Sequence, residues 1–78
     1  MNKVKVYDEY NNLCTNIKNY RLKNNLTQEK LAEKAKCSIS YIKQIESKKD
    51  FKNVSFLTII NICKALDISV ADLFKDSE

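Results

Sequence analysis

The apolar positions of this chain recur at the three- and four-residue spacings of helices, and polar residues divide them into five runs. The runs predict helices over residues 8–24, 28–35, 39–47, 56–66 and 70–75. Gly and Pro are both absent, which removes the usual turn residues of β-hairpins and leaves Asn, Ser, Thr and Asp to mark boundaries. The pattern therefore predicts an all-α fold, a compact five-helix bundle.

Four of the predicted helices follow a residue that is typical of the N-cap position. These residues are Thr27, Ser38, Ser55 and Ser69. Asp72 stands three positions after Ser69, which resembles a capping box with Asp in place of Glu. The Asn24–Asn25 pair separates the first two helices, because Asn accepts positive φ more readily than other non-glycine residues.

Each predicted helix carries an apolar face. The positions, in chain order, are Leu13, Ile17, Tyr20, Leu31, Ala32, Ala35, Ile42, Ile45, Phe56, Ile59, Ile62, Cys63, Leu66, Val70, Leu73 and Phe74. In the fourth helix we expect the set from Phe56 to Leu66 to face the core. Residues 48–54 are expected to form a polar loop. Residues 1–7, where Val4 and Val6 alternate with lysines, are either a strand-like arm or an extension of the first helix.

A chain of 78 residues has room for one domain, which we expect to span residues 1–78 with an acidic end at 76–78. The formal net charge is +4. Residues 1–66 hold thirteen cations and six anions (+7), whereas residues 67–78 hold one cation and four anions (−3). A basic body with an acidic tail indicates a polyanionic partner on one side of the molecule.

The composition excludes several kinds of site. There is no His, so triads, general bases and metal sites that depend on His cannot form. Cys14, Cys37 and Cys63 include no CxxC pair, which argues against a disulfide framework or a zinc site and favours buried thiols. No apolar run is long enough for a membrane span, and no signal peptide opens the chain. We expect a cytoplasmic protein that is not an enzyme, with no cofactor and no membrane partner.

Residues 27–46 read TQEKLAEKAKCSISYIKQIE, two capped helices joined by a very short turn. Small Ala32 allows the close approach that a steep helix crossing needs. The segment resembles the helix-turn-helix of the phage-repressor-like (Xre or Cro/repressor) family, and the resemblance extends over about residues 13–74. The matching positions are Ile17, Tyr20, Arg21, Leu26, Gln28, Ala32, Ile42, Ile45 and Glu46. It implies sequence-specific binding of double-stranded DNA, with the helix at 39–47 in the major groove.

The chain departs from the family pattern where Lys36 and Asp67 replace the usual glycines. Lys at positive φ costs on the order of 1 kcal/mol relative to Gly, which a packed domain can absorb. Arg21 is the only arginine among fourteen cations, so its position favours the bidentate guanidinium. The resemblance implies a partly buried structural pair between Arg21 and Glu46. A phosphate contact by Arg21 is the alternative.

On the predicted DNA-reading helix, the positions that face away from the core could contact base edges. They are Ile39, Ser40, Tyr41, Lys43 and Gln44. Ile39 is unusual, because relatives often place a long polar residue there. Phosphate contacts are expected at the start of the second helix and in the following loop. These residues are Gln28, Lys48, Lys49, Lys52 and Asn53. For each residue of either set, a solvated surface position is the alternative.

A second apolar stripe predicts a symmetric homodimer, since one reading helix covers only a few base pairs. The stripe contains Leu57, Ile60, Ile68 and Phe74. Alternatively, these residues cover the first helix or the N-terminal arm.

The segment NVSFLTIINICKALDIS and the Tyr41–Ile42 pair resemble the controller proteins of restriction–modification systems. That resemblance implies an autoregulatory dimer. With no appended ligand domain, control by protein concentration is expected, without a small-molecule ligand. A repressor from a phage or mobile element shares the same scaffold. A protein-interaction module that keeps the fold without reading DNA is the alternative of another class.

Overall fold

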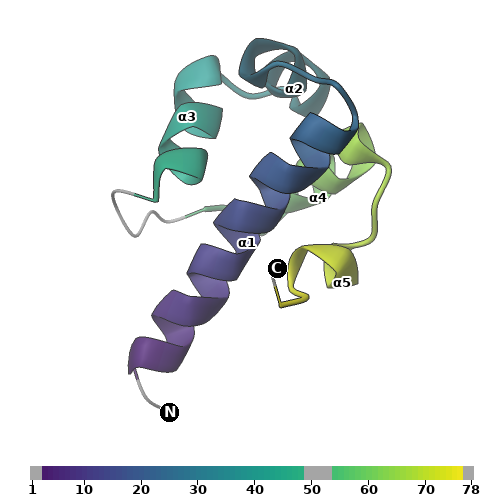
Figure 1. Ribbon diagram of the computed structural model, residues 1–78. Helices are drawn as coiled ribbons and strands as arrows, with labels where there is room; N and C mark the ends of the chain where they lie inside the picture. Colours follow the sequence, from purple (N-terminus) through teal and green to yellow (C-terminus); the bar gives the residue numbers. More distant parts are fainter. Residues whose placement is uncertain (1–2, 49–53, 77–78) are drawn as a thin grey trace.

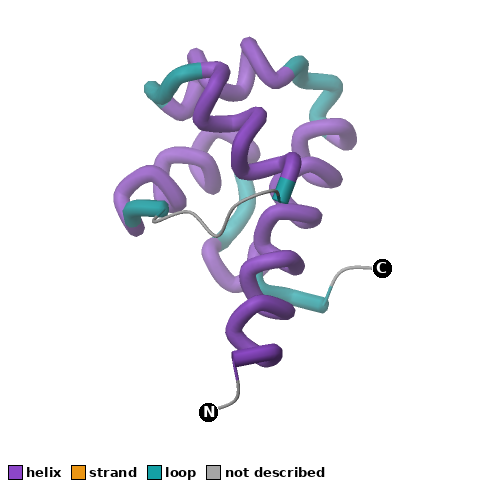
Figure 2. The backbone as a smooth tube through the Cα atoms, turned by 90° about the vertical axis from the view of Figure 1, so that its left-hand side faces the viewer, coloured by secondary structure: helices purple, strands orange, loops and turns teal. Residues whose placement is uncertain are grey.

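The computed structural model describes residues 3–48 and 54–76, with side chains from residue 8 onward. Five helices follow one another along the chain (Figure 1). They are α1 (Lys3–Lys23), α2 (Gln28–Ala35), α3 (Ile39–Ser47), α4 (Phe56–Leu66) and α5 (Val70–Leu73). Figure 2 shows only helices and loops in the described part of the chain. The prediction of an all-α fold is therefore confirmed.

The predicted bounds of α2, α3 and α4 are confirmed, whereas the two outer helices differ. α1 begins at Lys3, so residues 3–7 extend the first helix and do not form a strand-like arm. Its 21 residues span about 31 Å at 1.5 Å per residue, close to the 35 Å long axis of the molecule. α5 ends at Leu73, where Phe74 leaves the helical region with φ −99° and ψ 4°.

All four predicted N-caps form. The side chains of Thr27, Ser38 and Ser55 each accept a hydrogen bond from the backbone N–H three residues further on. Ser69 does the same with Asp72, and the Asp72 carboxylate accepts from the Ser69 backbone N–H at 3.0 Å, which completes the capping box. The hydrogen bonds from the Ser69 backbone and side chain and from Lys75 lower the pKa of Asp72.

Four residues in the turns that follow α1, α2, α3 and α4 have a left-handed backbone conformation. Asn25, Lys36, Lys48 and Asp67 have φ between 57° and 59°. Positive φ at Asn25, Lys36 and Asp67 was expected from the sequence, whereas Lys48 was not. At Lys36 the conformation lets the backbone N–H groups of Lys36 and Cys37 reach carbonyls in the last turn of α2.

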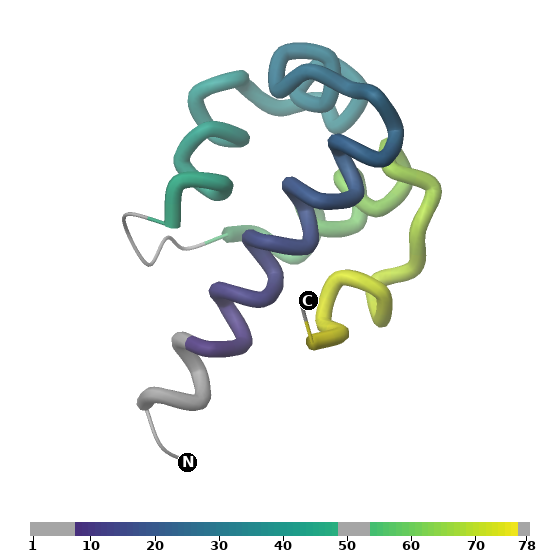
Figure 3. The backbone as a smooth tube through the Cα atoms, viewed as in Figure 1, coloured from purple at the N-terminus to yellow at the C-terminus, as the bar shows by residue number. Residues whose placement is uncertain are grey.

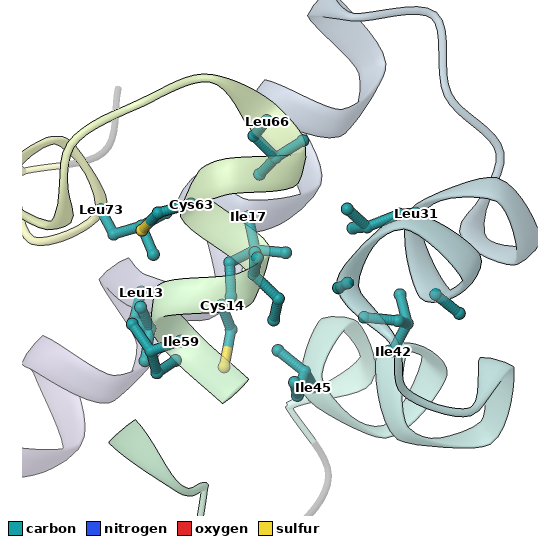
Figure 4. Close-up of a cluster of buried hydrophobic side chains, with 13 residues drawn as sticks. Leu13, Cys14, Ile17, Leu31, Ile42, Ile45, Ile59, Cys63, Leu66 and Leu73 are labelled. Carbon is teal, nitrogen blue, oxygen red and sulfur yellow. The ribbon is translucent and has the colours of Figure 1, made fainter. Parts of the chain in front are cut away.

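The core lies where all five helices meet, as Figure 4 shows for its labelled side chains. Its members are Leu13, Cys14, Ile17, Leu31, Ala32, Ala35, Ile42, Ile45, Ile59, Ile62, Cys63, Leu66 and Leu73. Phe56, which was expected to face this core, is 65% exposed, so that assignment is wrong. Phe56 is the first residue of α4, and the apolar face of the helix is covered only from Ile59 onward.

All three cysteines are free thiols: Cys14 and Cys63 are buried, and Cys37 is half-buried. Burial raises the pKa of each thiol. They pack as small apolar side chains and stay protonated at neutral pH.

Asn16 of α1 is buried within this apolar environment, which the pattern did not predict. Its side-chain amide donates hydrogen bonds to the carbonyl oxygens of Leu73 at 2.8 Å and Lys75 at 2.7 Å. Leu73 is the last residue of α5 and Lys75 lies two residues beyond it, so neither carbonyl has a partner in a following helical turn. Asn16 therefore holds the end of α5 beside the middle of α1, where Figure 3 shows the C-terminal segment. Within residues 3–48 and 54–76, no helix combines the length and apolarity of a membrane span.

Candidate nucleic-acid interface

The α2–turn–α3 unit places one helix across the other through a turn of three residues, 36–38. Leu31, Ala32 and Ala35 of α2 are buried, as are Ile42 and Ile45 of α3, and the two helices contact each other. The turn begins with the left-handed Lys36 and ends with the N-cap Ser38. α2 also packs against α4, so the unit is supported on its inner side while the outer side of α3 faces solvent.

Arg21 of α1 and Glu46 of α3 form a bidentate ion pair. Arg21 Nε donates to Glu46 Oε2 at 2.8 Å and Nη2 donates to Oε1 at 3.0 Å, while Nη1 donates to the Leu26 carbonyl at 2.8 Å. The two side chains are only 10% and 3% exposed. Removing one partner of such a buried pair strands the other charge, at a cost of about 3–5 kcal/mol. The pair therefore fixes the end of α3 against α1.

Gln28, the first residue of α2, joins the same cluster. Its Nε2 donates to Glu46 Oε1 at 3.1 Å, the oxygen that also accepts from Arg21. One carboxylate thus holds side chains from α1 and α2 to α3. The sequence predicted a phosphate contact for Gln28 but not this hydrogen bond, because nothing in its spacing indicates a partner in α3.

The predicted base-reading residues of α3 do not share one environment. Ile39, Ser40, Lys43 and Gln44 are exposed, whereas Tyr41 is half-buried and packs against the core. The four exposed positions form two adjacent pairs one helical turn apart. We call them the polar strip of α3, although Ile39 is apolar. Of the predicted phosphate contacts in the loop, Lys48 is exposed at the end of α3. Lys49, Lys52 and Asn53 lie outside the described residues.

A pocket of about 370 Å³ lies where α1, α2 and α3 meet. Its lining residues are Lys18, Arg21, Gln28, Lys43, Glu46 and Ser47. Lys18 and Ser47 were not singled out from the sequence. Helical spacing could have indicated both as neighbours of the predicted site, because Lys18 stands one turn before Arg21 on α1 and Ser47 stands one turn after Lys43 on α3.

The predicted dimer residues lie on the opposite elements, α4 and α5 with the turn between them. Leu57 is 68% exposed and Phe74 is 51% exposed. Ile60 and Ile68 are half-buried, and Ile68 packs against the core. Phe56 adds a further exposed ring at the start of α4. In the described part of the chain, no group of three or more Cys, Asp and Glu side chains is placed to hold a metal ion.

A helix-turn-helix family model matches residues 17–73. The control protein C.SmaI of Serratia marcescens is 43% identical over 61 residues, which are 78% of this chain and 70% of that protein. The crystal structure of the restriction-modification controller protein C.AhdI from Aeromonas hydrophila has a TM-score of 0.76 at 29% identity, covering 83% of this chain and 96% of that one. The crystal structure of the clp gene regulator ClgR from Corynebacterium glutamicum has a TM-score of 0.74 at 30% identity, covering 82% of this chain and 66% of that one.

Proposed function

Because the chain belongs to the Xre-type helix-turn-helix family of DNA-binding transcription regulators, we propose that it binds an operator as a homodimer with α3 in the major groove. The observation that carries the proposal is the cluster of Arg21, Gln28 and Glu46. It holds α1 and α2 to the end of α3 and leaves the polar strip of α3 exposed. A reading helix must be held rigidly in this way, because each base contact depends on its position.

Sequence would be read by four exposed residues of α3 and one half-buried residue. Lys43 suits the O6 and N7 acceptors of guanine, Gln44 suits adenine, and Ser40 can donate to or accept from either. Ile39 offers its apolar surface to a thymine methyl group. Tyr41 packs partly on the core, so we assign its hydroxyl to the edge of the contact, at a base or a phosphate.

Affinity would come mainly from the DNA backbone. Gln28 stands at the N-terminus of α2, where backbone N–H groups and the helix dipole favour a phosphate. Lys48, Lys49, Lys52 and Asn53 would contact the flanking backbone without reading sequence. Binding should therefore weaken steeply as salt rises.

The exposed apolar surface of α4 and α5 supports a symmetric dimer through Leu57, Ile60, Ile68 and Phe74, with Phe56 beside them. Two exposed phenylalanines and a leucine on two neighbouring elements are more than an isolated monomer needs. A dimer would present two copies of α3 to half-sites about one helical turn apart.

The relatives C.SmaI and C.AhdI are control proteins, which supports an autoregulatory role for this chain. We propose that it controls its own promoter in the cytoplasm, where its DNA lies, through its concentration and without a small-molecule ligand. No catalytic step is assigned to it.

The deciding experiment is fluorescence anisotropy against the DNA upstream of its own gene and against a scrambled duplex, over a salt series. We expect a preference of about 10³ or more for the upstream DNA, a steep salt slope and two protomers per site. Equal and weak binding to both duplexes would contradict sequence reading. Absence of binding at low salt would favour the protein-interaction module.

A further inference from the structure

The pocket between α1, α2 and α3 contains two lysines that lack an ion-pair partner among the described residues. They are Lys18 of α1 and Lys43 of α3. Glu46, the carboxylate in the lining, is already occupied by Arg21 and by the amide of Gln28. The positive charge of the pocket is therefore not neutralised from within the described protein.

The lining has the composition of an anion site. Lys18, Arg21 and Lys43 contribute three positive charges and Glu46 one negative charge, which leaves a net charge of +2 in the lining. Gln28 adds a side-chain amide, whereas the Ser47 hydroxyl in the lining already donates to the Gln44 carbonyl oxygen at 2.9 Å. Ammonium groups next to neutral donors bind phosphate oxygens through charge-assisted hydrogen bonds.

The pocket opens beside the surface that we assign to DNA. Lys43 and Ser47 stand one turn apart on α3, and Gln28 is the first residue of α2. We propose that the pocket binds one backbone phosphate of the operator and that Lys18 is its ligand from α1. The inference rests on the proposed function and extends the DNA interface to a third helix. Lys43 keeps its assignment to a base edge, so Lys18 supplies the charge of this contact.

The first test replaces Lys18, whose exposed side chain can be removed without disturbing the core. Lys34→Ala on α2 is the matched control, because Lys34 is also exposed and lies outside the pocket. Circular dichroism and thermal unfolding should be unchanged in both variants. We expect Lys18→Ala to weaken binding to operator and scrambled duplex alike by about three- to tenfold at 0.1 M salt. The salt slope should fall by roughly 0.9, and Lys34→Ala should stay within about twofold of the wild type.

The second test locates the contact with duplexes in which one phosphate at a time is replaced by an uncharged methylphosphonate. We expect one linkage in each half-site to weaken binding of the wild type more than binding of Lys18→Ala, since that variant has already lost the ammonium group at this phosphate. The phosphate site would be contradicted by equal sensitivity of both proteins at every linkage, or by equal binding of Lys18→Ala and Lys34→Ala. A wild type without preference for the upstream DNA would overturn the proposed function itself, so the two failures are distinguishable.

Discussion

The α2–α3 unit and the surface formed by α4 and α5 differ in the contacts that stabilise them and in the polarity of their outer faces. At the first, the buried Arg21–Glu46 pair holds the helices together, and the outer face of α3 is largely polar. At the second, the helices are held by apolar packing and by Asn16, and the outer face carries Phe56, Leu57 and Phe74. The polar face of α3 suits a charged, hydrated polymer, whereas the apolar face of α4 and α5 suits a second apolar surface.

The two regions also differ in how a substitution changes the stability of the protein. A buried ion pair leaves an unpaired charge when one partner is removed, which is far more costly than the pair is worth. Exposed apolar residues can be replaced with little effect on the monomer, because their side chains already contact water. Mutations at the first region should therefore lower stability, whereas mutations at the second should change association.

The largest effect is expected from Glu46→Ala, which strands Arg21 and removes the acceptor of Gln28. The free energy of unfolding should fall by about 3–5 kcal/mol, measured by urea denaturation of the purified protein. Glu33→Ala is the matched control, because Glu33 is exposed and forms only a surface pair with Lys30. It should cost less than about 1 kcal/mol. Equal costs for the two variants would mean that the pair does not hold α3 in place.

Asn16→Ala tests the anchor of α5 and should have the next largest effect. The change removes the donor to two carbonyls, and unpaired buried carbonyls cost about 1–3 kcal/mol. Hydrogen exchange should show the loss of protection concentrated in α5, with α2 and α3 little affected. Asn19→Ala, an exposed position of the same helix, provides the control. Uniform loss of protection across all helices would contradict a local anchoring role.

Leu57→Asp addresses the apolar surface directly. An exposed Leu can accept a charge in the monomer, but burying that charge in a dimer interface is costly, so dimerisation should weaken at least about tenfold. Sedimentation equilibrium measures the change. Leu22→Asp is the control, since Leu22 is 53% exposed but lies on α1. A dimer that survives Leu57→Asp and dissociates with Leu22→Asp would move the interface to α1.

The helices and their N-caps could be predicted because their causes are local. A serine before an apolar run caps the helix whatever the rest of the fold does, and α2, α3 and α4 have the predicted bounds. The assignment of the exposed face of α3 to DNA reading is a proposal that comes from the resemblance to a family, since composition alone does not identify such a face.

What could not be predicted depends on distant contacts. Phe56 stands three residues before Ile59, so its spacing places it on the buried face, but among the described residues its side chain stays 65% exposed whereas Ile59 is buried. Asn16 looks like a solvated polar residue, and its partners lie 57 and 59 residues away. Gln28 and Lys18 acquire their neighbours only when α1, α2 and α3 come together. A periodic pattern identifies the apolar face of a helix but not what covers it.

The smallest change in stability is expected at the left-handed residues that end α2 and α4. A residue with a Cβ atom is strained in this backbone conformation. Lys36 at φ 59° ends α2, and Asp67 at φ 57° ends α4. Lys36→Gly and Asp67→Gly should each raise the free energy of unfolding by about 0.5–1 kcal/mol, because Gly has no Cβ to clash in this conformation.

Lys36→Ala separates this cause from loss of the charge, since Ala keeps the Cβ and should give no gain. Urea denaturation of the three variants measures the differences, and equal stability of Lys36→Gly and Lys36→Ala would contradict backbone strain at the turn. The turn at Asp67 joins α4 to α5 and not to α3, so the gain in Asp67→Gly should leave the salt slope of DNA binding unchanged, and this separates stability from recognition.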